Sequence, residues 1–159
     1  MSYPVKKAFE EGKPVTKKVK GDDFSIEIRA EPNGQVDLHV ELCGIEKHAY
    51  ETVPIGLSDE ADRSLGSLLG EVLIRYAVEE AVRESGLERY PPPLKAIFEV
   101  GEKAATIVDE RKEELVRAVE PLGDVNSIRR AMEDRIVTEV LYNLGSLIHR
   151  AILRSASSK

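Results

Sequence analysis

Hydrophobic residues change their spacing near Ser58: before it they recur at every second position, and after it at every third or fourth. A spacing of two is typical of a strand with one buried face, and a spacing of three and four is typical of an amphipathic helix. The pattern predicts an α+β fold, in which an N-terminal antiparallel β-meander of three to four strands packs against three long C-terminal α-helices. We expect one domain over residues 1–159, with strands at about residues 14–55 and helices at about 58–156.

Two segments alternate apolar and polar residues, and the loop between them sets their register. The apolar positions are Phe24, Ile26, Ile28 and Ala30 in the first segment and Val36, Leu38, Val40 and Leu42 in the second. A two-residue loop at residues 33–34 would put charged and apolar residues on one face, because a slip of one residue turns a strand over. A three-residue loop with Gly34 in the left-handed conformation pairs Phe24 with Leu42 and keeps both apolar sets together.

The same register gives the hairpin a polar face, and the candidate binding residues lie on it. They are Glu27, Arg29, Asp37, His39 and Glu41. Arg29 would stand opposite Asp37 and Glu27 opposite His39, so both charge signs meet on neighbouring strands. The alternative interpretation of this face is a solvated surface without a partner.

Two further strands are predicted beside the hairpin. A lysine-rich edge strand over residues 14–20 turns back at residues 21–22 and places Val19 opposite Phe24. A fourth strand is predicted over residues 48–53, where a proline follows it.

The first long helix is predicted to begin at an N-cap on Ser58 and to end near Gly86, a length of roughly 40 Å. Gly66 and Gly70 are one turn apart inside it. Glycine in a helix costs about 1 kcal/mol relative to alanine, so we expect another helix to cross closely at these two positions.

Two more helices follow the stiff prolines at residues 91–93, which separate them from the first. The second is predicted to end at residues 121–123, and Asp124 or Asn126 to cap the third. The third helix carries a regular apolar stripe of Val137, Leu141, Leu144, Ile148 and Ala151, which Ile136, Val140 and Leu147 widen. So broad a stripe favours contact on two sides.

Charge is unevenly distributed around the total of −6. Residues 58–125 carry a net −7 and residues 126–159 a net +3. An acidic surface repels phosphate backbones, so nucleic acid is an unfavourable partner unless the arginines of the last helix share one exposed face. These arginines are Arg129, Arg130, Arg135, Arg150 and Arg154.

Composition favours a cytoplasmic protein without a membrane span. No uncharged run approaches the roughly 18 residues that a span needs, and the first residues lack the apolar segment of a signal peptide. A single cysteine, Cys43, excludes an intrachain disulfide. Few amide and sulfur side chains beside many charged ones are typical of thermophilic proteins.

The soft metal ligands that lie near one another in the sequence are His39, Cys43 and His48. Zinc needs four ligands, or three and a water molecule, and this spacing matches no zinc motif. We therefore predict no metal site and no cofactor. No catalytic residue is identified, because the phosphate-loop, dinucleotide and serine-nucleophile motifs do not occur.

Helix carboxylates offer an alternative function. Glu99 with Glu102 and Glu110 with Glu113 have the spacing that can hold magnesium, and Glu133 and Asp134 could complete such a set. A divalent-metal-dependent hydrolase of nucleotides or phosphoesters would use these residues. Glutamates at this spacing usually belong to a solvated helix face.

The predicted helices are longer than the predicted sheet. Strands of about six residues span roughly 20 Å, whereas the first and third helices approach about 40 Å. Apolar positions at the helix ends would face water in a monomer, so we expect a homo-oligomer that associates through its long helices. The corresponding function is that of a non-enzymatic binding or scaffold protein, or an accessory subunit, with a protein as a further candidate partner.

Overall fold

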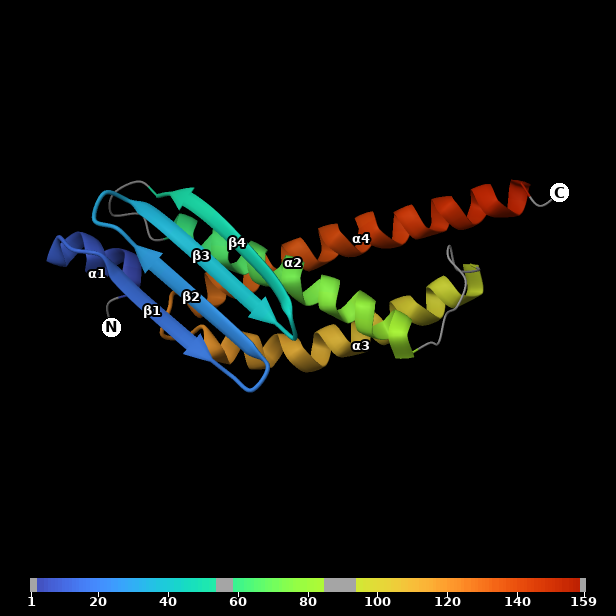
Figure 1. Cartoon of the computed structure of the whole chain (residues 1–159), viewed down its shortest axis with the longest axis horizontal. Coiled ribbons are helices and arrows are strands. Elements are labelled where there is room, and N and C mark those ends of the chain that lie inside the picture. The colour runs from blue at the N-terminus through green and yellow to red at the C-terminus, as the bar shows by residue number, and fades with distance from the viewer. Residues whose placement is uncertain (1–2, 54–58, 85–93, 158–159) are drawn as a thin grey trace.

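The computed structural model describes residues 3–53, 59–84 and 94–157, and within α3 and α4 it leaves the side chains of residues 94–97, 141 and 143–157 undescribed. Its elements are α1 (Pro4–Glu11), β1 (Val15–Lys20), β2 (Phe24–Ala30), β3 (Gln35–Leu42), β4 (Ile45–Thr52), α2 (Asp59–Glu84), α3 (Leu94–Ala118) and α4 (Val125–Ser157). The strands form one antiparallel sheet in the order β1-β2-β3-β4, and the three long helices form a second layer behind it (Figure 1). The α+β fold with a β-meander and long C-terminal helices is confirmed.

The predicted register of β2 and β3 is confirmed. Phe24 pairs with Leu42 and Ala30 with Val36, and all four side chains are buried. Gly34 has a φ of 94°, as a three-residue loop requires. The apolar face of this hairpin therefore packs against the helices, with α2 in contact with β3 and β4.

The predicted register of β1 is wrong by two residues. Val19 lies opposite Ile26 rather than Phe24, because the turn falls one residue later than predicted. Gly21 comes just before the two central turn residues; its backbone N–H donates to the carbonyl oxygen of Phe24 at 2.9 Å, and the space beside its Cα is filled by the Phe24 ring. A shift of two residues preserves parity, so Val19 still faces the core.

The predicted start of β4 is also wrong, since the strand begins at Ile45 and not at residue 48. A two-residue turn at Cys43 and Gly44 connects it to β3, with φ values of 50° and 86°. Positive φ at both positions is the conformation that matches the twist of a tight hairpin. The early start pairs Leu42 with Ile45 and brings three further residues into the sheet.

Helices α2 and α4 cross at the two glycines, as predicted. A Cβ atom added at Gly66 would lie 2.7 Å from the Cβ of Ala131, and one added at Gly70 would lie 2.7 Å from the carbonyl oxygen of Met132. Met132 is completely buried at this crossing. The glycines therefore allow α4 to approach the backbone of α2 and to close the core.

The predicted end of the second helix is wrong by three residues, because the chain turns before Pro121, whereas the predicted cap of the third helix is confirmed. Helix α3 ends at Ala118, and the Asp124 carboxylate caps α4 by accepting the backbone N–H groups of Asn126 and Ser127 at 2.9 and 3.2 Å. Ser58, Gly86 and residues 91–93 lie outside the described residues, so their predicted roles stay predictions.

Helix α1 was not predicted. It begins with Pro4 at its first turn and ends at Gly12, which has a φ of 67°. Proline at the start and a left-handed glycine after the end are a helix signature that was available in the sequence. The helix buries Pro4 and Ala8 against β1 and β2.

Candidate functional site

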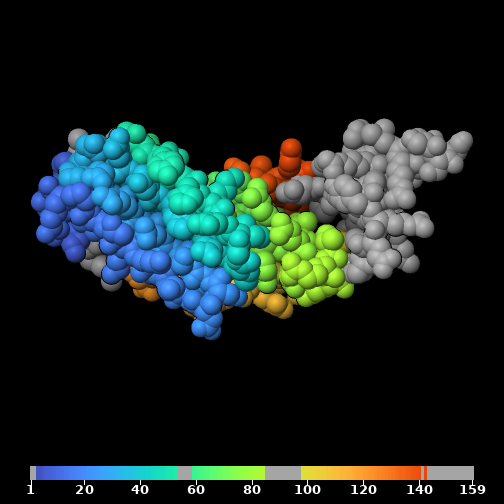
Figure 2. Space-filling model, viewed as in Figure 1, coloured from blue at the N-terminus to red at the C-terminus, as the bar shows by residue number. Residues whose placement is uncertain are grey.

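The five predicted binding residues share the outer face of the sheet, which is the face turned away from α2. The register places Glu27 opposite His39 and Arg29 opposite Asp37, and Glu41 follows on the same side of β3. Figure 2 shows the strands as one continuous surface in this view. That this surface binds a partner stays a prediction.

The outer face also contains a cluster that the sequence analysis did not assemble. His39 on β3 and His48 on β4 are direct cross-strand partners, and their imidazole rings stack with centroids 4.1 Å apart and planes 6° apart. Glu46 lies on the same face, with Oε1 2.6 Å from Nε2 of His39 and 3.8 Å from Nε2 of His48. One ligand atom from each of the three residues lies within 4.8 Å of the others.

The sequence feature that could have predicted this cluster is the turn before β4. If Cys43 and Gly44 form a two-residue turn, residues whose numbers sum to 87 are paired, and His39 must face His48. The first turn position is a cysteine, which rarely adopts a positive φ, so turn chemistry gave little indication of the loop. Two of the three metal ligands considered from the sequence therefore do meet, with Glu46 in place of Cys43.

Cys43 faces a different group of residues at the edge of the helical layer. Its thiol donates to Oδ2 of Asp23 at 3.4 Å, and Nη2 of Arg111 on α3 donates to Oδ1 of the same carboxylate at 2.6 Å. The Arg111 hydrogen bond lowers the pKa of Asp23 below its usual range, while burial and then the Asp23 carboxylate raise the pKa of the Cys43 thiol. A thiol with a raised pKa is a poor nucleophile and a poor metal ligand at neutral pH.

Two of the six helix carboxylates proposed for a metal-dependent hydrolase are paired with basic side chains. Glu113 accepts two hydrogen bonds from Arg129 at 2.8 and 3.1 Å, and Glu133 lies 3.3 Å from Nζ of Lys112. Within the described part of the chain, the one set of three or more His, Cys, Asp or Glu residues in ligand range is His39, Glu46 and His48.

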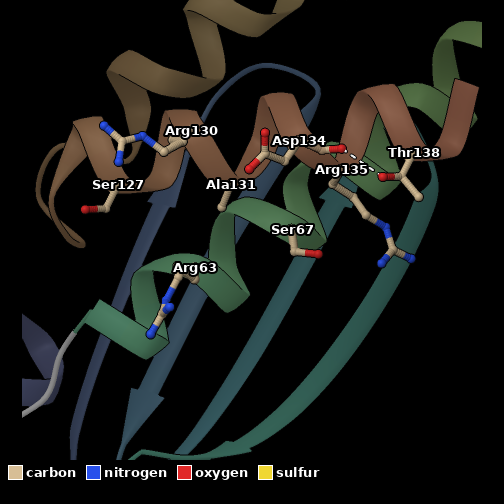
Figure 3. A pocket seen from close by; sticks show the side chains of 8 residues that line it. All are labelled: Arg63, Ser67, Ser127, Arg130, Ala131, Asp134, Arg135 and Thr138. Atoms are coloured by element: carbon tan, nitrogen blue, oxygen red, sulfur yellow. Dashed lines mark hydrogen bonds between the residues drawn. The ribbon is translucent and has the colours of Figure 1, made fainter.

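A polar groove of about 370 Å³ lies between α2 and α4 (Figure 3). Its lining residues are Arg63, Ser67, Ser127, Arg130, Ala131, Asp134, Arg135 and Thr138. The guanidinium groups of Arg63, Arg130 and Arg135 point in different directions rather than toward one point (Figure 3). Arg135 is also paired with Glu71 at 3.4 Å and Glu139 at 2.8 Å, so this groove presents no convergent anion site.

An apolar groove of about 190 Å³ lies between α2, α3 and α4. Its lining residues are Ile74, Val78, Gly101, Ala104, Ala105, Val108, Asp109, Ile136 and Val140. All but one of these residues lack a charge. Figure 1 shows that α2, α3 and α4 run on past the sheet. The volume is below the range of about 300–1,000 Å³ that is usual for small-molecule sites, so the groove suits protein side chains better than a substrate.

Two large apolar side chains are exposed beside this groove. Phe98 is 65% exposed and lies one helical turn before Gly101, and Val137 is 60% exposed and lies one turn before Val140. Val137 is the first residue of the predicted apolar stripe of α4; the later residues of that stripe lie outside the described side chains. The first residue of the predicted stripe, Val137, is therefore exposed to solvent.

No known protein family, curated protein or solved structure matches this chain. None of the helices in the described part of the chain combines the length and the apolar character that crossing a lipid bilayer requires. The arguments on function consequently rest on the residues themselves.

Proposed function

We propose that this chain is a non-enzymatic binding protein that works as a homodimer, in which the helical ends beyond the sheet pack against those of a second copy. The observation that carries the proposal is the apolar groove between α2, α3 and α4 with exposed Phe98 and Val137 beside it. Helix α4 has 33 residues, or about 50 Å, whereas the longest strands have 8 residues, or about 27 Å. The sheet is too short to cover the helices along their whole length.

A second copy is the occupant that fits this surface best. A two-fold interface uses the same patch on both chains, so it needs protruding and hollow parts side by side. Phe98 and Val137 supply the protruding parts and the groove beside them supplies the hollow part. One patch of this chain is therefore suited to pack against itself.

The charge distribution supports the same occupant. Residues 58–125 carry a net −7 and residues 126–159 a net +3. In a two-fold pair that packs through these helices, the basic segment of one copy approaches the acidic helices of the other. Opposite charges on the facing helices attract each other and therefore favour association of the two copies.

The alternatives have less support among the described residues. A nucleic-acid surface on α4 would need several free arginines, but of the three described ones Arg129 is paired with Glu113, and Arg135 with Glu71 and Glu139. The helix carboxylates of a metal-dependent hydrolase do not converge on a ligand set within the described part of the chain.

Sedimentation velocity of single-residue variants tests the proposal. Val137→Asp and Phe98→Asp place a charge on the groove surface, and both should fold normally because the native side chains are exposed. Burying an unpaired carboxylate in the interface should weaken dimerisation by at least about 100-fold and give monomers at tens of micromolar protein.

Thr138→Asp is the matched control. It adds the same charge at the next residue of α4, but Thr138 is exposed and lines the polar groove on a different side of the helix. We expect it to sediment as the wild type does. Dimers that persist in both Val137→Asp and Phe98→Asp, or a wild type that is monomeric throughout, would contradict the proposal.

A further inference from the structure

The outer face of the sheet holds three side chains of the types that bind transition metals in proteins. Imidazole nitrogen and carboxylate oxygen are common zinc ligands, and a set of three leaves at least one position open for water. His39, Glu46 and His48 come from two hydrogen-bonded neighbouring strands. Their backbone positions are therefore fixed before any metal binds.

From this cluster we infer a binding site for a divalent first-row transition metal such as Zn²⁺, coordinated by Nε2 of His39, Nε2 of His48 and a carboxylate oxygen of Glu46. The site lies on the sheet and away from the apolar groove, so it does not rest on the proposed dimer. A water molecule completes the coordination on the solvent side.

The ligand atoms lie close enough for this site, but the two imidazole rings must tilt before both can coordinate one ion, because their planes are 6° apart. Tetrahedral ligands at about 2.0 Å from zinc lie about 3.3 Å from one another. Oε1 of Glu46 lies 2.6 Å from Nε2 of His39 and 3.8 Å from Nε2 of His48, and all three atoms lie within 4.8 Å of one another. Zinc binding therefore lengthens the first distance and shortens the second, and it tilts the two stacked rings so that both nitrogen lone pairs point to one ion.

The contact between His39 and Glu46 also calls for a positive charge. Nε2 of His39 is shielded from solvent and lies 2.6 Å from Oε1 of Glu46, yet the two atoms do not have the geometry of a hydrogen bond. An unprotonated imidazole nitrogen and a carboxylate oxygen repel each other through their lone pairs unless the two atoms share a proton or a metal ion. A metal ion satisfies both atoms, and it also satisfies His48, which a single shared proton does not.

The surrounding charges favour a cation. Glu27 lies opposite His39 on β2, and Glu41 lies opposite Glu46 on β3. Asp37 is two residues before His39 on the same face. The basic residues of this face are Arg29 on β2, which is paired with Glu31 at 3.3 Å, and Lys18 and Lys20 on β1, at the far side of the sheet. The negative potential around the cluster raises the local concentration of divalent ions.

Calorimetric titration of the full-length protein with ZnCl₂ at pH 7.5 tests the site. We expect one Zn²⁺ per chain and a melting temperature raised by about 5 °C at saturating zinc. His39→Asn, His48→Asn and Glu46→Gln each remove one ligand with little change in shape, and each should weaken zinc binding by at least about 10-fold. Co²⁺ in place of Zn²⁺ should show the visible absorption of a nitrogen- and oxygen-coordinated ion.

Two controls use the other soft ligands of the chain. Cys43→Ser removes the single thiol and His149→Asn removes the third histidine, so both variants should bind zinc as the wild type does. The site is wrong if zinc gives no binding heat and no melting shift, if His39→Asn and His48→Asn bind as tightly as the wild type, or if either control abolishes binding. A ratio of one Zn²⁺ per two chains would also overturn it, since that result describes an ion shared between surface histidines of different molecules.

Discussion

Gly70 of α2 and Met132 of α4 meet so closely that no side chain fits between them: a Cβ atom added at Gly70 would lie 2.7 Å from the carbonyl oxygen of Met132. The obstructing atom belongs to the backbone, which moves only if the whole helix moves. The same crossing includes Gly66, whose added Cβ would lie 2.7 Å from that of Ala131. This pair of glycines sets the distance between the two longest helices.

Gly70→Ala should lower the free energy of unfolding by about 2 kcal/mol, because the clash with the Met132 carbonyl exceeds the gain of about 1 kcal/mol in helix propensity. Urea unfolding followed by circular dichroism measures the change. Ser67→Ala, in the same helix but beside the open polar groove, is the control and should change stability by less than about 0.5 kcal/mol. A Gly70→Ala protein as stable as the wild type would mean that the helices are farther apart.

Asp62 gives the molecule a predictable pH dependence. Asp62 is only 5% exposed, and this burial is the main reason why its pKa is raised from 3.8 to about 6. Because the folded state binds this proton more tightly than the unfolded chain, the stabilisation is complete below about pH 4 and is lost as the pH rises through about 6. The free energy of unfolding lost in this way is at most about 3 kcal/mol.

Asp62→Asn should therefore be more stable than the wild type at pH 7 and equally stable at pH 4. Its side-chain oxygen can still accept the backbone N–H of Asp124, which the Asp62 carboxylate accepts at 3.3 Å. Asp59→Asn changes an exposed carboxylate in the same helical turn and serves as the control. If the difference in unfolding free energy between Asp62→Asn and the wild type does not change between pH 4 and pH 7, Asp62 does not have a raised pKa.

Asp23 and Arg111 connect the turn between β1 and β2 to α3 through a contact of 2.6 Å. Arg111 also lies over the ring of Tyr76, 5.8 Å from its centroid. A double-mutant cycle with Asp23→Asn and Arg111→Met should give a coupling energy of about 1 kcal/mol, a modest value because Asp23 is partly exposed. Since the pKa of Asp23 is lowered, this coupling should be present at pH 7 and fade as the pH falls below about 4. Additive single effects at pH 7 would show that the contact contributes nothing.

Glu71 joins three elements, because it accepts a hydrogen bond from Lys47 of β4 and lies 3.4 Å from Arg135 of α4. Glu71→Ala should lower the unfolding free energy by about 1–2 kcal/mol, since it leaves two half-buried cations without this carboxylate. Glu80→Ala, which removes a pair with the exposed Arg83 on one helix, should cost less than about 0.5 kcal/mol. Chemical denaturation measures the unfolding free energy of both variants. Equal losses for Glu71→Ala and Glu80→Ala would contradict a larger contribution of Glu71 to stability.

The sequence predicted those parts of the fold in which a local pattern is compatible with a single arrangement of the backbone. The register of β2 and β3 followed from parity and from Gly34, and the crossing of α2 and α4 followed from two glycines that helix propensity disfavours. The position of β1 depended on how the Phe24 ring packs on Gly21, which is a tertiary contact without a local pattern.

The candidate sites were harder to predict for the same reason. His39 was identified as a polar-face residue, but its partners lie on β4, whose start depends on a cysteine with a φ of 50°. The apolar groove combines residues from three helices up to 66 positions apart, such as Ile74 and Val140. Sequence periodicity predicted uncovered apolar helix surface, and only the packing of α2, α3 and α4 shows where that surface becomes concave.

Association through the helical ends is the central claim, and light scattering after size exclusion tests it most directly. The chain has a mass of 17.7 kDa. At tens of micromolar protein in moderate salt, we predict one species with twice that mass, which dissociates on dilution. A monodisperse species of 17.7 kDa across that concentration range would contradict the claim.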